Sequence, residues 1–262
     1  MKLECILTAC NDNKLYMDFI PFFIKAWKKL YPYVDVKIIL ISESIPLKYK
    51  EYSKNIILFT PLKDVCTILT SQVIRVLYPA ILQCKEAVLI TDIDMIPMSS
   101  TYFSDCIKQF NSEQFIVLRD IHYKNSEIMI CYNAASPKVW SSIFLIKTVN
   151  DIKEFLIELN KVKNILDIKD DVLNNNKKYS WILDQRLLFD RVKIWQQNGG
   201  IVMGLTDNIT GYKRLCRSQF SSLTDDIKDN IKKEKYVDYH CKRPFDKYKE
   251  INDQILDLLS KK

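Results

Sequence analysis

Short apolar runs alternate with helix-like stretches over the first third of the chain. Two stretches, 16–32 and 65–84, carry aromatic and aliphatic side chains at the spacing of an amphipathic helix. The apolar runs around them are LECILTACND (3–12), DVKIILISE (35–43), NIILFTP (55–61) and AVLITDID (87–94). Because strands joined by helices pair in parallel and are covered on both faces, this alternation predicts an α/β fold with a mostly parallel central sheet flanked by helices.

The fourth apolar run ends on two carboxylates, Asp92 and Asp94. In an extended chain, positions two apart share a face, so both side chains are expected to point to one side. Two carboxylates this close repel each other and lose hydration near a core, so a cation should neutralise them. Hard oxygen ligands suit Mg²⁺ or Mn²⁺, and either ion can also hold a diphosphate. Ligands of parallel sheets bind beyond the carboxyl ends of the strands, where the polar segment 8–12 should also lie.

The second half of the chain mixes further strands and helices. Strands are expected over 114–120, 127–136 and 199–206, and helices over 149–166, 181–195 and 246–262. No internal repeat or long linker interrupts the pattern, so we expect residues 1–262 to fold as a single domain. The segment KRLCRSQF, with Arg214 and Arg217, is expected to be a solvated basic face, with a phosphate-facing loop as the alternative. The last helix should pack against the domain, with peripheral contact to an anionic membrane as the alternative.

Composition narrows the class of protein. Of the 262 residues, 48% are hydrophobic, and no apolar run approaches the roughly 20 residues of a membrane span. The first residues lack the pattern of a secretory leader, and the 8 cysteines form no C-x-x-C pair, which favours reduced thiols. We therefore expect a cytoplasmic protein. The net charge of +7 is spread along the chain rather than gathered in a block, so it favours solubility over nucleic-acid binding.

Several short motifs resemble those of one enzyme family, in the same order along the chain. LITDIDMIPM resembles the D-x-D element of GT-A glycosyltransferases, in particular glycosyltransferase family 8 and related viral and bacterial enzymes. The other matching segments are SQVIRVLYPAIL, CYNAAS, WILDQRLLF and, more loosely, YHCKRPF. The resemblance spans roughly residues 3 to 245. It implies a GT-A domain with a nucleotide-binding half at 1–98, an acceptor and sugar-binding half at 99–245, and a C-terminal helix at 246–262.

The resemblance also implies roles for individual residues. Asp92, Asp94 and His240 would bind Mn²⁺ or Mg²⁺, and Asp184 and Gln185 would lie beside the reacting carbon. The donor, a UDP-sugar, would be bound by Thr8, Cys10, Asn11, Arg75, Asp92, Asn133 and Lys242. Its sugar would pass to a glycan or to a protein-linked sugar. Arg75, Lys242 or Arg243 could supply further positive charge to the departing diphosphate.

The mechanism is left open between two outcomes. The likeness to family 8 implies retention of anomeric configuration, in which case Asp184 would orient the reactants. If the enzyme inverts, Asp184 or Asp120 becomes the candidate general base and should approach the acceptor hydroxyl.

Other readings of the same residues exist. A sugar-nucleotide-binding or glycan-binding protein that kept the fold and lost turnover is one, because Ala135 replaces the glycine of the family and the His240 element is compressed. A phosphatase with a D-x-D pair is less favoured, because its pair follows the first strand of the core rather than the fourth. A nucleic-acid-binding module is disfavoured by the lack of a basic stripe.

Overall fold

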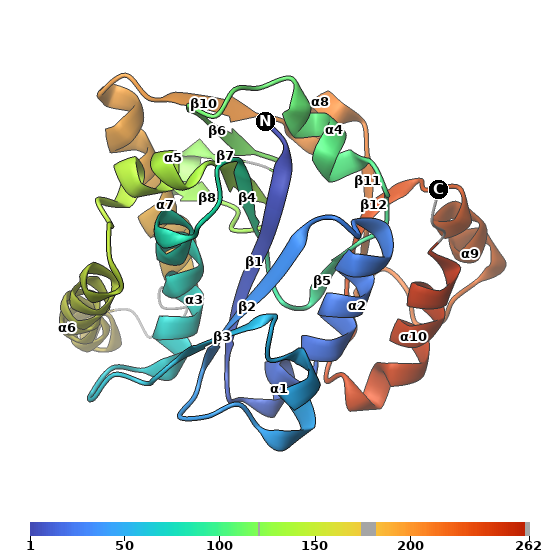
Figure 1. Ribbon diagram of the computed structural model, residues 1–262, viewed down its shortest axis with the longest axis horizontal. Coiled ribbons are helices and arrows are strands. Elements are labelled where there is room, and N and C mark those ends of the chain that lie inside the picture. The colour runs from blue at the N-terminus through green and yellow to red at the C-terminus, as the bar shows by residue number, and fades with distance from the viewer. Residues whose placement is uncertain (120, 174–181, 260–262) are drawn as a thin grey trace.

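The computed structural model describes residues 1–119, 121–173 and 182–259. Its centre is a seven-stranded sheet with the order β10-β6-β9-β4-β1-β2-β3 (Figure 1). The strands are β1 (Leu3–Asn11), β2 (Asp35–Ile41), β3 (Ile56–Phe59), β4 (Ala87–Ile90), β6 (Gln114–Val117), β9 (Asn133–Ala135) and β10 (Ile201–Gly204). All neighbours pair in parallel except β9, which runs antiparallel to both β4 and β6. The mostly parallel sheet predicted from the sequence is therefore confirmed.

Helices cover both faces of this sheet. In Figure 1, α3 (Thr67–Leu77), α5 (Pro137–Phe144), α6 (Val149–Leu173) and α7 (Leu183–Gln197) lie on one side, and α2 (Ile20–Leu30), α9 (Asp225–Lys232) and α10 (Lys249–Leu258) lie on the other. The shorter helices are α1 (Lys14–Met17), α4 (Tyr102–Lys108) and α8 (Asp207–Thr210). Because both faces are covered, the central strands are apolar throughout, and Ile6, Leu7 and Leu89 are completely buried. Among the described residues, no helix is long and apolar enough to cross a membrane.

A second, three-stranded sheet joins the C-terminal part of the chain to the end of β4. It consists of β5 (Met95–Pro97), β11 (Lys213–Cys216) and β12 (Tyr236–His240), in the order β11-β12-β5. Strand β12 runs antiparallel to β5, with His240 opposite Met95. The backbone N–H of Cys241 also donates to the carbonyl of Asp94 at 2.8 Å. This pairing brings residues of β12 directly beside the D-x-D segment.

Three details of the predicted elements differ from the structure. The strand expected to run through Asp94 ends at Ile90, and Ile93 and Asp94 form a turn in which the N–H of Met95 donates to the carbonyl of Asp92. The strand expected over 127–136 is divided between β8 (Glu127–Ile128), which pairs with β7 (Ile121–His122), and β9. The second sheet was not predicted, because its strands are short and two of them, β11 and β12, carry charged residues among the apolar ones.

The last helix packs on β12, as expected from the sequence. The buried side chain of Asn252 in α10 accepts a hydrogen bond from the Tyr239 hydroxyl at 2.8 Å. The same amide donates to the carbonyl of Lys242 at 3.0 Å. Lys29 in α2 donates to the carbonyl of Leu256 at 2.7 Å, which joins the two helices on this side of the sheet.

Arg214 is not part of a solvated basic face, and the sequence-based expectation is wrong for it. Only 9% of its side chain is exposed, and its guanidinium lies 2.6 Å from Asp238 and 2.7 Å from Asp207 and donates to the carbonyl of Leu118 at 2.8 Å. The three acceptors come from β12, α8 and the end of β6. Because none of them is adjacent to Arg214 in sequence, the local pattern could not reveal this network.

We predict that Arg214→Ala lowers the free energy of unfolding by about 3–5 kcal/mol, because it leaves the Asp238 carboxylate buried without its cation. Urea denaturation followed by circular dichroism measures this change. Lys138→Ala is the control, since its ion pair with Glu113 is exposed and should add little stability. Equal stability of the Arg214 and Lys138 variants would contradict the assigned role of Arg214.

Candidate functional site

A cavity of about 370 Å³ lies at the carboxyl ends of the central parallel strands. Its wall combines the end of β1, helices α3 and α7, the turn after β4, and residues around β11 and β12. The polar side chains that line it include Cys10, Asn11, Gln72, Arg75, Asp92, Asp94, Asp184, Gln185, Arg217, His240 and Arg243. The expectation that polar residues meet at this edge of the sheet is confirmed.

Arg75 joins two parts of the cavity wall. Its Nη1 contacts Asp92, its Nη2 lies 2.6 Å from Asp184 Oδ2, and its Nε donates to the carbonyl of Gln72. Burial raises the pKa of Asp184 although the Arg75 guanidinium lowers it, and the negative charge of Asp92 raises it further. One cation is thus shared by two carboxylates, which leaves this end of the cavity short of positive charge.

Asp94 has the opposite surroundings. Its Oδ2 lies 2.7 Å from Arg217 Nη1, 3.4 Å from His240 Nε2 and 3.5 Å from Arg243 Nη1. Burial acts to raise the pKa of this carboxyl, but His240 and Arg217 hold that pKa at about 2. Asp94 is therefore ionised at neutral pH. The effect on His240 is reciprocal. Burial acts to lower the pKa of His240, but the Asp94 carboxylate outweighs burial and raises that pKa above the ordinary value.

The predicted metal ligands line the same cavity, but their side chains do not converge on one point. Two carboxylates and an imidazole are suitable donors for Mn²⁺ or Mg²⁺, so the donor set of Asp92, Asp94 and His240 fits such an ion. Yet in the described part of the chain no three His, Cys, Asp or Glu side chains converge as a metal cluster. The reason is that Asp92 faces Arg75 while Asp94 faces Arg217.

Three predicted donor-binding residues do not line the cavity. The Thr8 side chain is completely buried, and the Asn133 amide donates to the carbonyls of Met129 and Ile130, both at 2.8 Å. The Lys242 ammonium donates to the carbonyls of Arg217 and Phe220, at 2.9 and 2.6 Å. Asp120, the alternative base, lies outside the described residues.

The sequence analysis did not select Arg217 as a site residue and named Arg243 only among several sources of charge. For the segment of Arg217 it preferred a solvated basic face to a phosphate-facing loop, whereas Arg217 lines the cavity and pairs with Asp94. It follows β11, which the sequence did not reveal, so nothing local could separate it from the surface lysines and arginines around it. Arg243 lies over the ring of Tyr16, with 5.4 Å between its guanidinium carbon and the ring centre.

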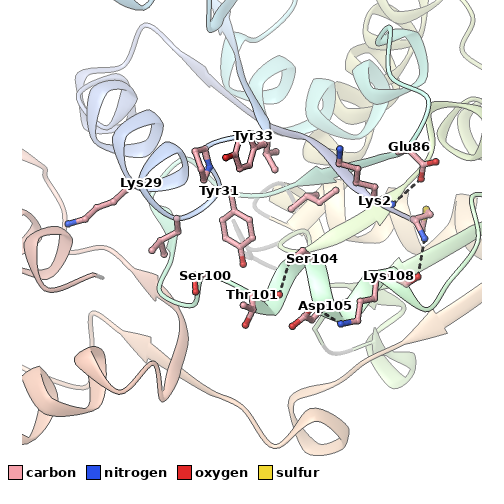
Figure 2. A pocket seen from close by; sticks show the side chains of 15 residues that line it. Lys2, Lys29, Tyr31, Tyr33, Glu86, Ser100, Thr101, Ser104, Asp105 and Lys108 are labelled. Atoms are coloured by element: carbon pink, nitrogen blue, oxygen red, sulfur yellow. Dashed lines mark hydrogen bonds and ion pairs between the residues drawn. The ribbon is translucent and has the colours of Figure 1, made fainter. Parts of the chain in front are cut away.

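A larger cavity, of about 740 Å³, lies at the amino ends of β1, β2 and β4. Several of its polar groups are already engaged, since Lys108 pairs with Asp105 at 2.8 Å and Ser104 donates to the carbonyl of Thr101. Figure 2 shows Lys29 pointing away from Tyr31 and Tyr33. Because the predicted carboxylates and His240 line the smaller cavity at the carboxyl ends, that cavity is the candidate site.

No family model matches this sequence, and no curated protein matches it by sequence. Solved structures do match its fold. The glycosyltransferase GlyE of Streptococcus pneumoniae TIGR4 aligns with a TM-score of 0.51 at 13% identity, over 100% of this chain and 61% of that chain. The galactosyltransferase LgtC, solved in complex with donor and acceptor sugar analogues, aligns with a TM-score of 0.49 at 13% identity, over 98% of this chain and 97% of that chain. The chain has the GT-A fold of glycosyltransferases that its motifs predict.

Proposed function

We propose that this protein is a metal-dependent glycosyltransferase that moves a sugar from a UDP-sugar to a hydroxyl of a glycan or of a protein-linked sugar, with retention of configuration. The observation that carries the proposal is the meeting of Arg75, Asp92, Asp94, Asp184 and His240 in one cavity. These residues come from four motifs that are far apart in sequence. The fold adds support at the level of architecture.

The charges of the cavity suit a diphosphate leaving group. When a sugar leaves a nucleotide, negative charge gathers on the diphosphate, and fixed cations that face it lower the barrier. Asp92, Asp94 and His240 would hold Mn²⁺ or Mg²⁺, which when bound supplies a Lewis acid to that leaving group. Cys10 and Asn11, at the end of β1, are the proposed contacts for the base and ribose.

Asp184 is better placed to orient reactants than to remove a proton. Its Oδ2 accepts from Arg75, and its Oδ1 accepts from the backbone N–H of Gln185 at 2.9 Å. A general base needs an oxygen within reach of the acceptor hydroxyl, and both oxygens of this carboxylate are engaged. This arrangement supports retention over inversion with Asp184 as the base. Gln185, the next residue on α7, also lines the cavity and is the proposed partner of the sugar.

The alternative function is binding of a sugar nucleotide or a glycan without transfer. Two observations favour it: the Lys242 ammonium is hydrogen-bonded to backbone carbonyls and does not line the cavity, and Asp92 and Asp94 are both paired with arginines. A cytoplasmic location, a viral or bacterial origin and the lack of a nucleic-acid partner stay predictions from the sequence.

Calorimetric titration of UDP, GDP and UMP, each with Mn²⁺ and with a chelator, tests the donor and the metal. We expect UDP to bind with Mn²⁺ and to lose that affinity in chelator. Asp94→Asn should weaken the Mn²⁺-dependent affinity for UDP by more than about 10-fold, because it removes a charged metal ligand. Asp35→Asn, an exposed carboxylate at the amino end of β2, is the control and should bind like the wild type. Equal UDP affinity in Mn²⁺ and chelator would refute metal dependence.

Asp184→Asn tests the reacting centre. We expect the release of UDP from UDP-galactose or UDP-glucose to fall by at least about 100-fold, while UDP affinity changes little, because Asp184 acts beside the sugar rather than on the nucleotide. Asp190→Asn, an exposed carboxylate on the same helix, is the matched control. An unchanged rate in Asp184→Asn would place the reacting carbon elsewhere. A wild type that binds both sugar nucleotides and releases no UDP, with or without added glycans, would favour the binding function.

A further inference from the structure

Two arginines that face the cavity converge on one oxygen atom. Arg217 Nη1 and Arg243 Nη1 lie 2.7 and 3.5 Å from Asp94 Oδ2. The two guanidiniums and the single carboxylate of Asp94 carry a surplus of one positive charge. At the other end of the cavity Arg75 is shared by Asp92 and Asp184, so the surplus of cations is confined to the Asp94 end.

Both guanidiniums have N–H donors that are not used by the contacts to Asp94. Arg217 uses Nη1 for Asp94 and for the carbonyl of Cys241, at 3.0 Å, and Arg243 uses Nη1 for Asp94 and the Tyr16 hydroxyl, at 3.0 Å. Within the described residues, nothing hydrogen-bonds the Nε and Nη2 groups of either side chain. Their side chains are 23% and 25% exposed, so these donors are partly desolvated and reachable from the cavity.

Lys242 cannot fill the same role from its position in the structure. Its ammonium donates to two backbone carbonyls, one of which belongs to Arg217. Lys242 therefore holds the segment that carries Arg217, and the two arginines present the charge to the cavity. A guanidinium can grip a phosphate with two parallel hydrogen bonds, which an ammonium cannot do.

We propose that Arg217 and Arg243 form the diphosphate clamp of this protein, and that Arg217 couples diphosphate binding to metal binding at Asp94. The inference rests on the proposed function. A divalent ion bound at Asp94 Oδ2 would compete with Arg217 for that oxygen. A guanidinium released from Asp94 would turn further donors toward the diphosphate. Coupling of this kind is reciprocal, so the diphosphate should in turn favour the metal by drawing Arg217 away from Asp94.

The first test uses Mn²⁺ alone, without nucleotide, measured by electron paramagnetic resonance titration. Arg217→Gln should bind Mn²⁺ about 10-fold more tightly than the wild type, because the competing cation is gone. Lys213→Gln is the matched control, since it removes one exposed positive charge from β11 and should leave the affinity unchanged. An affinity of Arg217→Gln no tighter than that of the wild type overturns the coupling.

The second test compares UDP with uridine at saturating Mn²⁺, because their affinity ratio isolates the diphosphate. That ratio should fall about 10- to 100-fold in Arg217→Gln and in Arg243→Gln, and should keep an intermediate value in Arg217→Lys, which retains the charge without the planar fork. Thermal melting checks that each variant is folded. A ratio that survives in both glutamine variants but is lost in Lys242→Gln overturns the clamp. If the wild type binds no UDP, the proposed function is overturned. If the wild type binds UDP and Arg217→Gln binds it equally well, only the role of Arg217 is overturned.

Discussion

The candidate site depends on the neutralisation of carboxylates that the fold has buried. Asp94 and Asp184 are almost completely buried, and a lone ionised carboxylate in such a place would cost several kcal/mol. Arginines from distant segments pair with these carboxylates: Arg75 on α3 pairs with Asp184 and Asp92, and Arg217 after β11 pairs with Asp94. These ion pairs connect α3, α7, the turn after β4 and the second sheet. The same contacts that permit burial thereby fix the relative positions of the groups that the proposed chemistry requires.

The antiparallel pairing of β12 with β5 is the second requirement. It places His240 opposite Met95, one residue after Asp94, so an imidazole from the C-terminal part of the chain meets a carboxylate that follows the fourth strand. The backbone hydrogen bonds between β12 and β5 hold His240 close enough to Asp94 for their side chains to meet. A shift of the pairing by one residue would turn His240 to the other face of its strand.

The sequence predicted the central sheet well because its strands are buried on both faces and so are continuously apolar, as in AVLI at 87–90. Through short motifs it also predicted a shared site for Arg75, Asp92, Asp94, Asp184 and His240, and these five residues line one cavity. It failed on the second sheet, whose strands have three to five residues and of which β11 and β12 carry charged side chains. It did not predict the partners of Arg214, Arg217 and Lys242, for a common reason. Three basic residues in two short polar segments look alike in sequence, and only their tertiary partners separate a buried ion pair, a cavity cation and a cap on backbone carbonyls.

Asn252 on α10 connects the outer layer of the molecule to this site. Its amide holds both the Tyr239 hydroxyl and the carbonyl of Lys242, on either side of the peptide units that carry His240 and Cys241. The C-terminal helix is therefore a support for the cavity wall, although it contributes no residue to the lining. Substitutions on this helix alone would change the spacing between the imidazole and the arginines, while every residue that lines the cavity stays the same.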